Sequence, residues 1–121
     1  MCGGIRTEAY AGTFGECPGT PLQQVSLAKL IIVWGNNATT CNLHLMRQIN
    51  AAKHQGAKLV VVDPRRIRVA EQAHLHLAVR PGTDVVLAWA IAVELERLGA
   101  FDQSFIEQHV LGAEAFMAGA R

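Results

Sequence analysis

Two short apolar runs, each opened by a lysine, dominate the hydrophobic pattern of this chain, at residues 29–34 and 58–62. Neither run alternates with polar residues, and both are too short for a free-standing helix, so they predict strands buried on both faces. The first run stops at Gly35, which permits a sharp turn. The second stops before Pro64, which cannot donate to a sheet. A third strand is predicted over 74–79.

Apolar residues at helical spacing separate these strands. They predict a helix over 41–54 that ends at Gly56, and a longer one over 84–98 that ends at Gly99. The Leu, Met and Trp residues of both helices are expected to form core stripes. Weaker or shorter helices are predicted over 3–14, 65–73 and 102–109, and a loop over 15–24.

The alternation of strands and helices with short links predicts an α/β fold with parallel strands. We expect a three-layer, Rossmann-like arrangement in which a small sheet of about three strands is flanked by helices. The whole chain, residues 1–121, reads as a single partial dinucleotide-binding domain. Its predicted parts are an N-terminal helix and loop (1–28), the strand and helix core (29–99) and a C-terminal helical tail (100–121).

Composition narrows the class of protein. The 121 residues are 50% hydrophobic and 17% charged with a net charge of +1, and the largest basic group is Arg65-Arg66-x-Arg68, so no nucleic-acid partner is expected. The longest apolar run, Val85 to Val93, is too short to span a membrane. Because the chain is so apolar and its predicted sheet is small with two edges, we expect the isolated chain to form a homo-oligomer.

The cysteines and the N-terminus suggest a compartment. Cys2, Cys17 and Cys41 have no CxxC or four-ligand metal spacing, which argues against a cluster and favours a reducing compartment. The N-terminal residues lack the pattern of a signal peptide. We therefore predict a cytoplasmic protein.

The carboxyl ends of the three predicted strands carry the candidate chemistry. These ends are Gly35-Asn36-Asn37, Asp63-Pro64-Arg65 and Pro81-Gly82-Thr83-Asp84, and in a parallel sheet they lie at the same edge. They offer backbone amides, guanidinium groups and two carboxylates. A carboxylate favours guanine over adenine, because guanine presents two adjacent donors. An alternative stays open, in which both aspartates are helix caps and Gly82 is a turn residue.

Three motifs in order carry a family resemblance. W-G-x-N occupies residues 34–37, G-A-K-L-V-V-V-D-P-R-R occupies 56–66, and A-x-x-A-x-x-H-L-x-x-R-P-G-T-D occupies 70–84. Together they resemble the molybdopterin oxidoreductases of the dimethyl-sulfoxide-reductase type, which use bis-(molybdopterin guanine dinucleotide). The similarity runs from Leu30 through Ala88.

The resemblance implies that this segment of a larger oxidoreductase holds the guanosine diphosphate part of one molybdopterin guanine dinucleotide. The first strand end would meet the diphosphate and ribose, the second would flank the ribose and guanine, and the third would close over the base. The implied cofactor-binding residues are Trp34, Gly35, Asn37, Thr40, Asp63, Arg65, Gly82, Thr83 and Asp84. Its partners would be a guanine nucleotide and the remaining domains of the enzyme.

The resemblance also implies a metal ligand. Family members place the protein ligand of molybdenum or tungsten thirteen residues before a glycine and about 32 before the W-G pair, and Cys2 stands at those distances from Gly15 and Trp34. Cys2 is thus the implied catalytic thiolate. His74 and His76 lack a third ligand, so packing is expected there rather than a metal.

One rival interpretation shares this fold. In it the chain is a non-catalytic α/β module that self-associates through its apolar faces and binds no cofactor. An ordinary NAD-binding domain is disfavoured, because no G-x-G-x-x-G follows the first strand.

Overall fold

The computed structural model describes residues 4–15 and 19–121. Its helices and strands in chain order are α1 (Gly4–Phe14), the 3-10 helix η1 (Leu22–Leu27), β1 (Leu30–Trp34), α2 (Ala38–Cys41), α3 (Leu43–His54), β2 (Lys58–Val62), α4 (Arg68–Glu71), β3 (Leu75–Leu77), α5 (Asp84–Arg97), α6 (Gln103–His109) and α7 (Ala113–Ala120).

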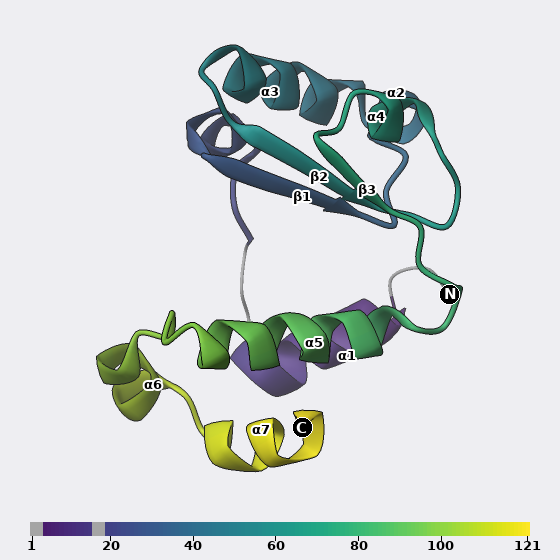
Figure 1. Cartoon of the computed structure of the whole chain (residues 1–121). Coiled ribbons are helices and arrows are strands. Elements are labelled where there is room, and N and C mark those ends of the chain that lie inside the picture. Colours follow the sequence, from purple (N-terminus) through teal and green to yellow (C-terminus); the bar gives the residue numbers. More distant parts are fainter. Residues whose placement is uncertain (1–3, 16–18) are drawn as a thin grey trace.

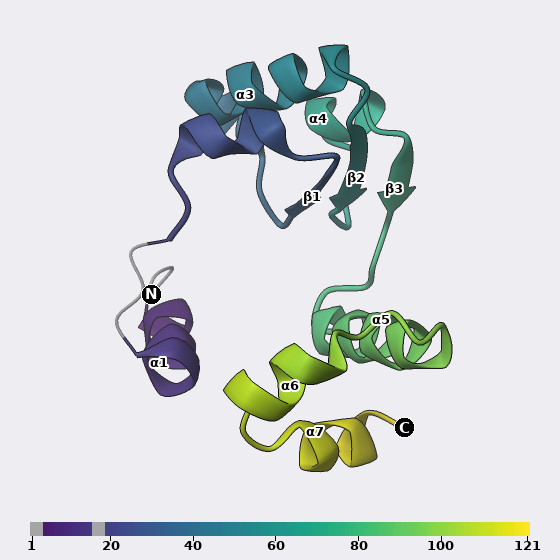
Figure 2. The same ribbon diagram turned by 90° about the vertical axis from the view of Figure 1, so that its left-hand side faces the viewer.

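The three strands form one parallel sheet in the order β1-β2-β3. Helices α3 and α4 cover one face of the sheet, while α1 and α5 lie on its other side (Figure 1). The second view shows the same layers and places α6 and α7 beyond α5 (Figure 2). The predicted α/β fold, a small parallel sheet of three strands flanked by helices, is confirmed.

The core lies between the sheet and α3. In β1, Ile31 and Val33 point into this core, and from α3 the side chains of Ile49 and Ala52 are fully buried against them. Helix α3 forms one wall because its apolar residues recur at helical spacing. At the centre of the sheet Leu59 is fully buried.

The second face of β1 is open, so the prediction that this strand is buried on both faces is wrong. Burial alternates along β1, and Leu30 and Ile32 keep 54% and 49% of their surface exposed. The central strand β2 comes closer to the prediction of burial on both faces, because the neighbouring residues Val61 and Val62, which point to opposite faces, are 0% and 1% exposed. An unbroken apolar run indicates that both faces can be covered, but the covering layer must come from other segments.

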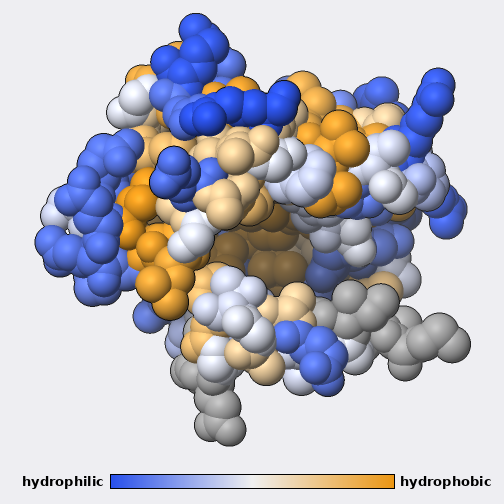
Figure 3. All heavy atoms as spheres, turned by 90° about the horizontal axis from the view of Figure 1, so that it is seen from below, coloured by the Kyte–Doolittle hydropathy of each residue, from blue (hydrophilic) through white to orange (hydrophobic). Residues whose placement is uncertain are grey.

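Helix α5 does not supply that layer. All of its residues are described and none is buried, and Trp89 and Leu95 remain 37% and 39% exposed. The predicted core stripe of this helix is therefore wrong, because α5 lies against α7 rather than tightly under the sheet. Viewed from below, the surface is hollowed and apolar residues line the hollow (Figure 3).

Membrane insertion of a helix finds no support in the described residues. Over 4–15 and 19–121, every helix is too short or too polar to cross a bilayer.

Candidate functional site

The carboxyl ends of the three strands lie side by side. In the sheet Trp34 is opposite Val62, which in turn is opposite Leu77. Two further backbone bonds extend this alignment beyond the strands: the amide of Gly35 donates to the carbonyl of Val62 at 2.9 Å, and that of Asp63 donates to Leu77 at 3.2 Å. The segments that follow the three strands therefore begin at one edge of the sheet, on the right in Figure 1.

The first strand end is shaped by a glycine and an asparagine. Gly35 turns the chain with a φ of +59°, a value that glycine adopts without strain. Asn37 precedes α2, its carbonyl accepts the amide of Thr40 at 2.9 Å, and its Oδ1 accepts the hydroxyl of Thr39 at 2.8 Å. The Thr40 side chain is exposed. Because the Gly35 amide is used within the sheet, this glycine contributes the shape of the turn rather than a free donor.

The second strand end is fixed by hydrogen bonds on both sides. The Oδ1 atom of Asp63 accepts the amide of Arg65 at 2.8 Å, and the ring Nε2 of His76 bonds the Asp63 carbonyl at 2.8 Å. Asp63 is half-buried, while the Arg65 side chain is exposed. This strand end thus presents the Asp63 carboxylate, fixed by a backbone hydrogen bond, beside the exposed guanidinium of Arg65.

The third strand end is a tight turn. The amide of Thr83 donates to the carbonyl of Arg80 at 3.0 Å, with Pro81 and Gly82 between them and a φ of +86° at Gly82. This arrangement is typical of a type II turn. The Thr83 hydroxyl also donates to the Arg80 carbonyl, at 2.8 Å, so its proton is used inside the turn.

The turn delivers Asp84 to the end of β1. The indole Nε1 of Trp34 donates to Oδ1 of Asp84 at 2.6 Å, although the two residues are 50 positions apart. The link after β3 must therefore return to the first strand before α5 begins. Two predicted site residues are joined directly by this bond, which the sequence pattern did not indicate.

The two histidines act on the backbone. The Nδ1 atom of His74 accepts the amide of Leu59 at 3.0 Å, while His76 bonds the carbonyl of Asp63. Sequence reasoning treated both as packing residues and missed that His76 positions the Asp63 loop. Two polar residues within an apolar strand were the available signal. In residues 4–15 and 19–121, His, Cys, Asp and Glu side chains form no group of three suited to a metal ion.

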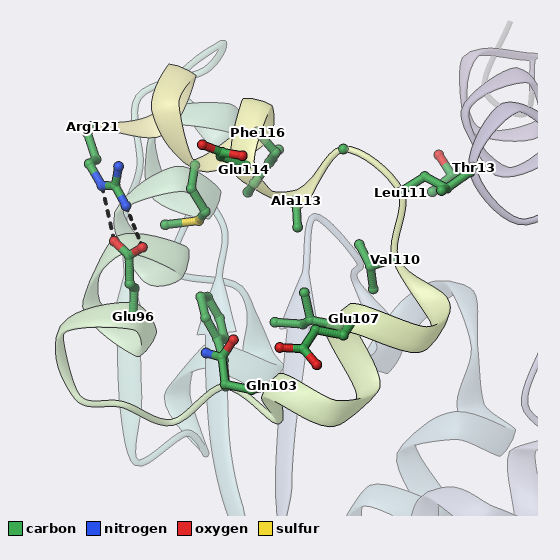
Figure 4. A pocket seen from close by; sticks show the side chains of 14 residues that line it. Thr13, Glu96, Gln103, Glu107, Val110, Leu111, Ala113, Glu114, Phe116 and Arg121 are labelled. Atoms are coloured by element: carbon green, nitrogen blue, oxygen red, sulfur yellow. Dashed lines mark hydrogen bonds and ion pairs between the residues drawn. The ribbon is translucent and has the colours of Figure 1, made fainter.

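A pocket of about 780 Å³ lies away from the strand ends, among α5, α6 and α7. Its lining includes Phe101, Ile106 and Met117, and an ion pair between Glu96 and Arg121 stands at one side (Figure 4). None of the nine predicted cofactor-binding residues belongs to its described lining. The strand ends, rather than this pocket, are therefore the candidate site. Cys2, the remaining predicted site residue, lies outside the described residues.

Comparisons with known proteins match nearly the whole chain. The family model for molybdopterin oxidoreductases matches residues 4–98. A probable oxidoreductase of Bacillus subtilis (strain 168) is 33% identical over 112 residues, which cover 93% of this chain and 17% of that protein. A nitrate reductase of Synechocystis sp. is 31% identical over 119 residues, covering 96% of this chain and 17% of that protein.

A solved structure extends the likeness to the fold. The acetylene hydratase from Pelobacter acetylenicus matches with a TM-score of 0.85 and 27% identity, over 98% of this chain and 16% of that one. The chain thus spans about 17% of the length of the curated relatives named above.

Proposed function

Because this chain belongs to the molybdopterin oxidoreductase family, we propose that it holds the guanosine diphosphate part of one molybdopterin guanine dinucleotide at its strand ends. It does so as a segment of a larger molybdenum or tungsten oxidoreductase. One observation carries the proposal: two carboxylates, Asp63 and Asp84, stand at one edge of a parallel sheet. Ligands of open α/β sheets bind at this edge.

The carboxylate of Asp84 suits the guanine edge. A carboxylate accepts two parallel hydrogen bonds, and guanine presents two adjacent donors, N1–H and the 2-amino group. Adenine lacks this pair. Trp34 occupies one acceptor position on Oδ1 of Asp84. The Oδ2 atom of Asp84 accepts no hydrogen bond from any described residue. Asp63 also accepts one hydrogen bond, from the Arg65 amide, but it is half-buried, whereas Asp84 is exposed and therefore more accessible to a base.

The first two strand ends suit the polar remainder of the nucleotide. The exposed hydroxyl of Thr40 and the guanidinium of Arg65 are donors for phosphate or ribose oxygens. An added Cβ at Gly35 or Gly82 would meet no described atom within 4 Å, so a ligand can approach the backbone there. These groups fit a nucleoside diphosphate in charge and in chemistry.

When bound, the metal and pterin supply the redox chemistry, and the residues of this chain hold and orient the nucleotide end. Cys2 completes the proposal as the thiolate that ligates molybdenum or tungsten, since soft metals favour thiolates. In the full-length enzyme, Cys2→Ala is expected to abolish turnover while the pterin content stays unchanged. Loss of the pterin together with activity would contradict a role limited to the metal.

Calorimetric titration of the chain with GDP and ADP tests the nucleotide assignment. We expect tighter binding of GDP, and Asp84→Asn is expected to weaken GDP binding by about 1–3 kcal/mol, because it removes a charge-assisted pair of hydrogen bonds. Asp102→Asn is the matched control, since Asp102 caps α6 by accepting the amide of Phe105. Equal affinity for GDP and ADP, unchanged by Asp84→Asn, would contradict the assignment.

A second candidate function is the self-associating α/β module without a cofactor. The open faces of β1 and α5 favour it, because large exposed apolar surfaces mark interfaces. Gentle purification followed by nucleotide analysis separates the two functions. Bound guanine nucleotide supports the first, whereas a nucleotide-free oligomer supports the second.

A further inference from the structure

The hydrogen bond between Trp34 and Asp84 joins the end of the first strand to the start of the helix after the third. Trp34 is the last residue of β1 and half-buried, and Asp84 is the first residue of α5 and exposed. Their donor and acceptor atoms, Nε1 and Oδ1, are 2.6 Å apart. An exposed carboxylate at the start of a helix is otherwise free to rotate toward the amides of its own first turn.

The indole restricts that rotation in a specific way. Its ring nitrogen is a donor and has no acceptor capacity, so it bonds the carboxylate only as a fixed N–H. The backbone of Trp34 is held in the sheet, in register with Val62, and the residue is half-buried. One carboxylate oxygen is thereby tied to the rigid end of β1, and the other is left without a partner among the described residues.

We propose that Trp34 is a positioning residue, which orients the Asp84 carboxylate to accept the paired N1–H and 2-amino donors of guanine. The inference rests on the proposed function and assigns Trp34 a role through Asp84. Guanine specificity then depends on an N–H group in β1 as well as on the carboxylate in α5.

The structural role of the ring and the role of its N–H can be separated by substitution. Trp34→Phe keeps an aromatic ring at the strand end and removes the donor. Trp34→His loses the second ring but keeps an N–H, because Nε2 of histidine occupies the ring position of the indole nitrogen. Trp89 in α5 provides the control, since Trp89→Phe makes the same change at a site that lacks the carboxylate contact.

The experiment measures affinities for GDP, IDP and ADP by calorimetry in wild type, Trp34→Phe, Trp34→His, Asp84→Asn and the double variant Trp34→Phe/Asp84→Asn. IDP keeps N1–H but lacks the 2-amino group, so the difference in affinity between GDP and IDP reports the hydrogen bond of the 2-amino group alone. We expect Trp34→Phe to lower the GDP-to-ADP preference roughly tenfold, the typical effect of one hydrogen bond to a charged group. Trp34→His and Trp89→Phe are expected to keep the preference.

Non-additivity identifies action through Asp84. If Trp34 works only by orienting this carboxylate, the double variant loses no more preference than Asp84→Asn alone. The indole N–H resonance, read in Trp89→Phe so that a single indole remains, is expected to shift in Asp84→Asn. This readout needs no nucleotide and still applies if Trp34→Phe fails to fold.

The outcomes separate this inference from the proposed function. A GDP preference in wild type that survives in folded Trp34→Phe overturns the positioning role and leaves the proposed function intact. An indole resonance unmoved by Asp84→Asn overturns it as well. Wild-type protein without any preference for GDP over ADP overturns both the proposed function and the inference that rests on it.

Discussion

The α/β unit, residues 22–77, and the C-terminal helices, residues 84–121, differ in what they do with their apolar side chains. Among the described residues, Met117 is the one buried apolar side chain outside the α/β unit. Helix α5 is highly apolar, yet none of its side chains is buried. The difference lies in the surfaces available, because the crossover helix α3 packs on β2 and shares a buried core with β1, whereas α5 has α7 beside it.

This contrast shows that an apolar pattern specifies an element and one of its faces without specifying the partner. A strand, a helix and a second parallel strand close a core within about thirty residues of chain, the size of one such unit. A helix after the last strand has no such return and depends on whatever surface lies next to it. Four comparisons of variants test how far the two regions differ.

The largest expected effect comes from emptying the core of the α/β unit. Ile49 is fully buried in α3, and Ile49→Ala is expected to cost about 2–5 kcal/mol of unfolding free energy, because it removes buried methylenes and leaves a cavity. Leu95→Ala in α5 is expected to cost about 1 kcal/mol or less, because Leu95 is already 39% exposed. Urea unfolding of both variants measures the difference. Equal losses would remove the distinction between the regions.

A smaller effect is expected from the histidine that bonds the backbone of β2. Leu59 is fully buried and its amide donates to Nδ1 of His74, so His74→Ala is expected to cost about 1 kcal/mol in urea unfolding. His74→Asn places an acceptor oxygen near the same position and is expected to recover most of the loss. Gln108→Ala breaks an exposed bond to Ser104 in α6 and serves as the control. Full stability of His74→Ala would show that this bond contributes nothing.

The open face of the sheet is expected to drive association of the isolated chain. Ile32 is 49% exposed, and Ile32→Gln is expected to raise the dimer dissociation constant about tenfold by removing apolar contact area. Leu111→Gln changes a fully exposed loop residue and is the control. Sedimentation velocity measures the constants. A monodisperse 13.1 kDa species at high micromolar concentration would contradict the predicted homo-oligomer.

The smallest expected effect concerns an ion pair on α5. Arg97 donates to Glu94 and lowers the pKa of that carboxyl below its usual 4.5, with both side chains largely exposed. A lowered folded-state pKa means that the contribution to stability is present above pH 4.5 and is lost as the pH falls through the lower value. Exposure and salt keep this contribution small.

Unfolding midpoints of the wild type and of Glu94→Gln are measured between pH 6 and pH 3. The wild type is expected to lose this small contribution to stability over that range, and Glu94→Gln is not. Glu107→Gln is the control, because Glu107 makes no ion pair among the described residues. A steep loss of stability in wild type that disappears in Glu94→Gln would mean that the C-terminal helices are held far more firmly than their exposure indicates.

The sequence predicted the elements best where short-range chemistry marks their ends. The strand at 58–62 matches β2 residue for residue, because Gly56 ends the preceding helix with a φ of +93° and Asp63-Pro64 ends the strand. The short helix predicted over 102–109 begins at the expected place, because the Asp102 carboxylate accepts the amide of Phe105 at the start of α6. These signals act within three or four residues and can be read locally.

Two helical features of the α/β unit were not predicted, again for local reasons. The expected helix over 41–54 breaks at Asn42, whose φ of −150° separates α2 from α3 and whose side chain accepts the amide of Leu45. An asparagine that bonds nearby backbone competes with a continuous helix. The 3-10 helix Leu22–Leu27 also escaped prediction, because part of it falls in the segment expected to be a loop.

The convergence of the three strand ends was predictable from parallel pairing alone, and the backbone bonds of Gly35 and Asp63 are in accord with it. The contact between Trp34 and Asp84 was not, because it depends on the path of the link 78–83, which no periodic pattern describes. The prediction of which side chains are buried was wrong for a related reason. Whether Ile32 and Trp89 are covered depends on surfaces far away in the chain.

The bond between Trp34 and Asp84 also has a consequence for the order of folding. Closing a loop of chain costs entropy that grows with its length, so contacts between distant residues form after local ones. This bond spans 50 residues, whereas His74 reaches Leu59 across 15. The sheet and α3 are therefore expected to assemble first, with the candidate site completed afterwards. In Trp89→Phe protein the remaining indole is Trp34, and its fluorescence during refolding would report the moment at which the third strand end reaches the first.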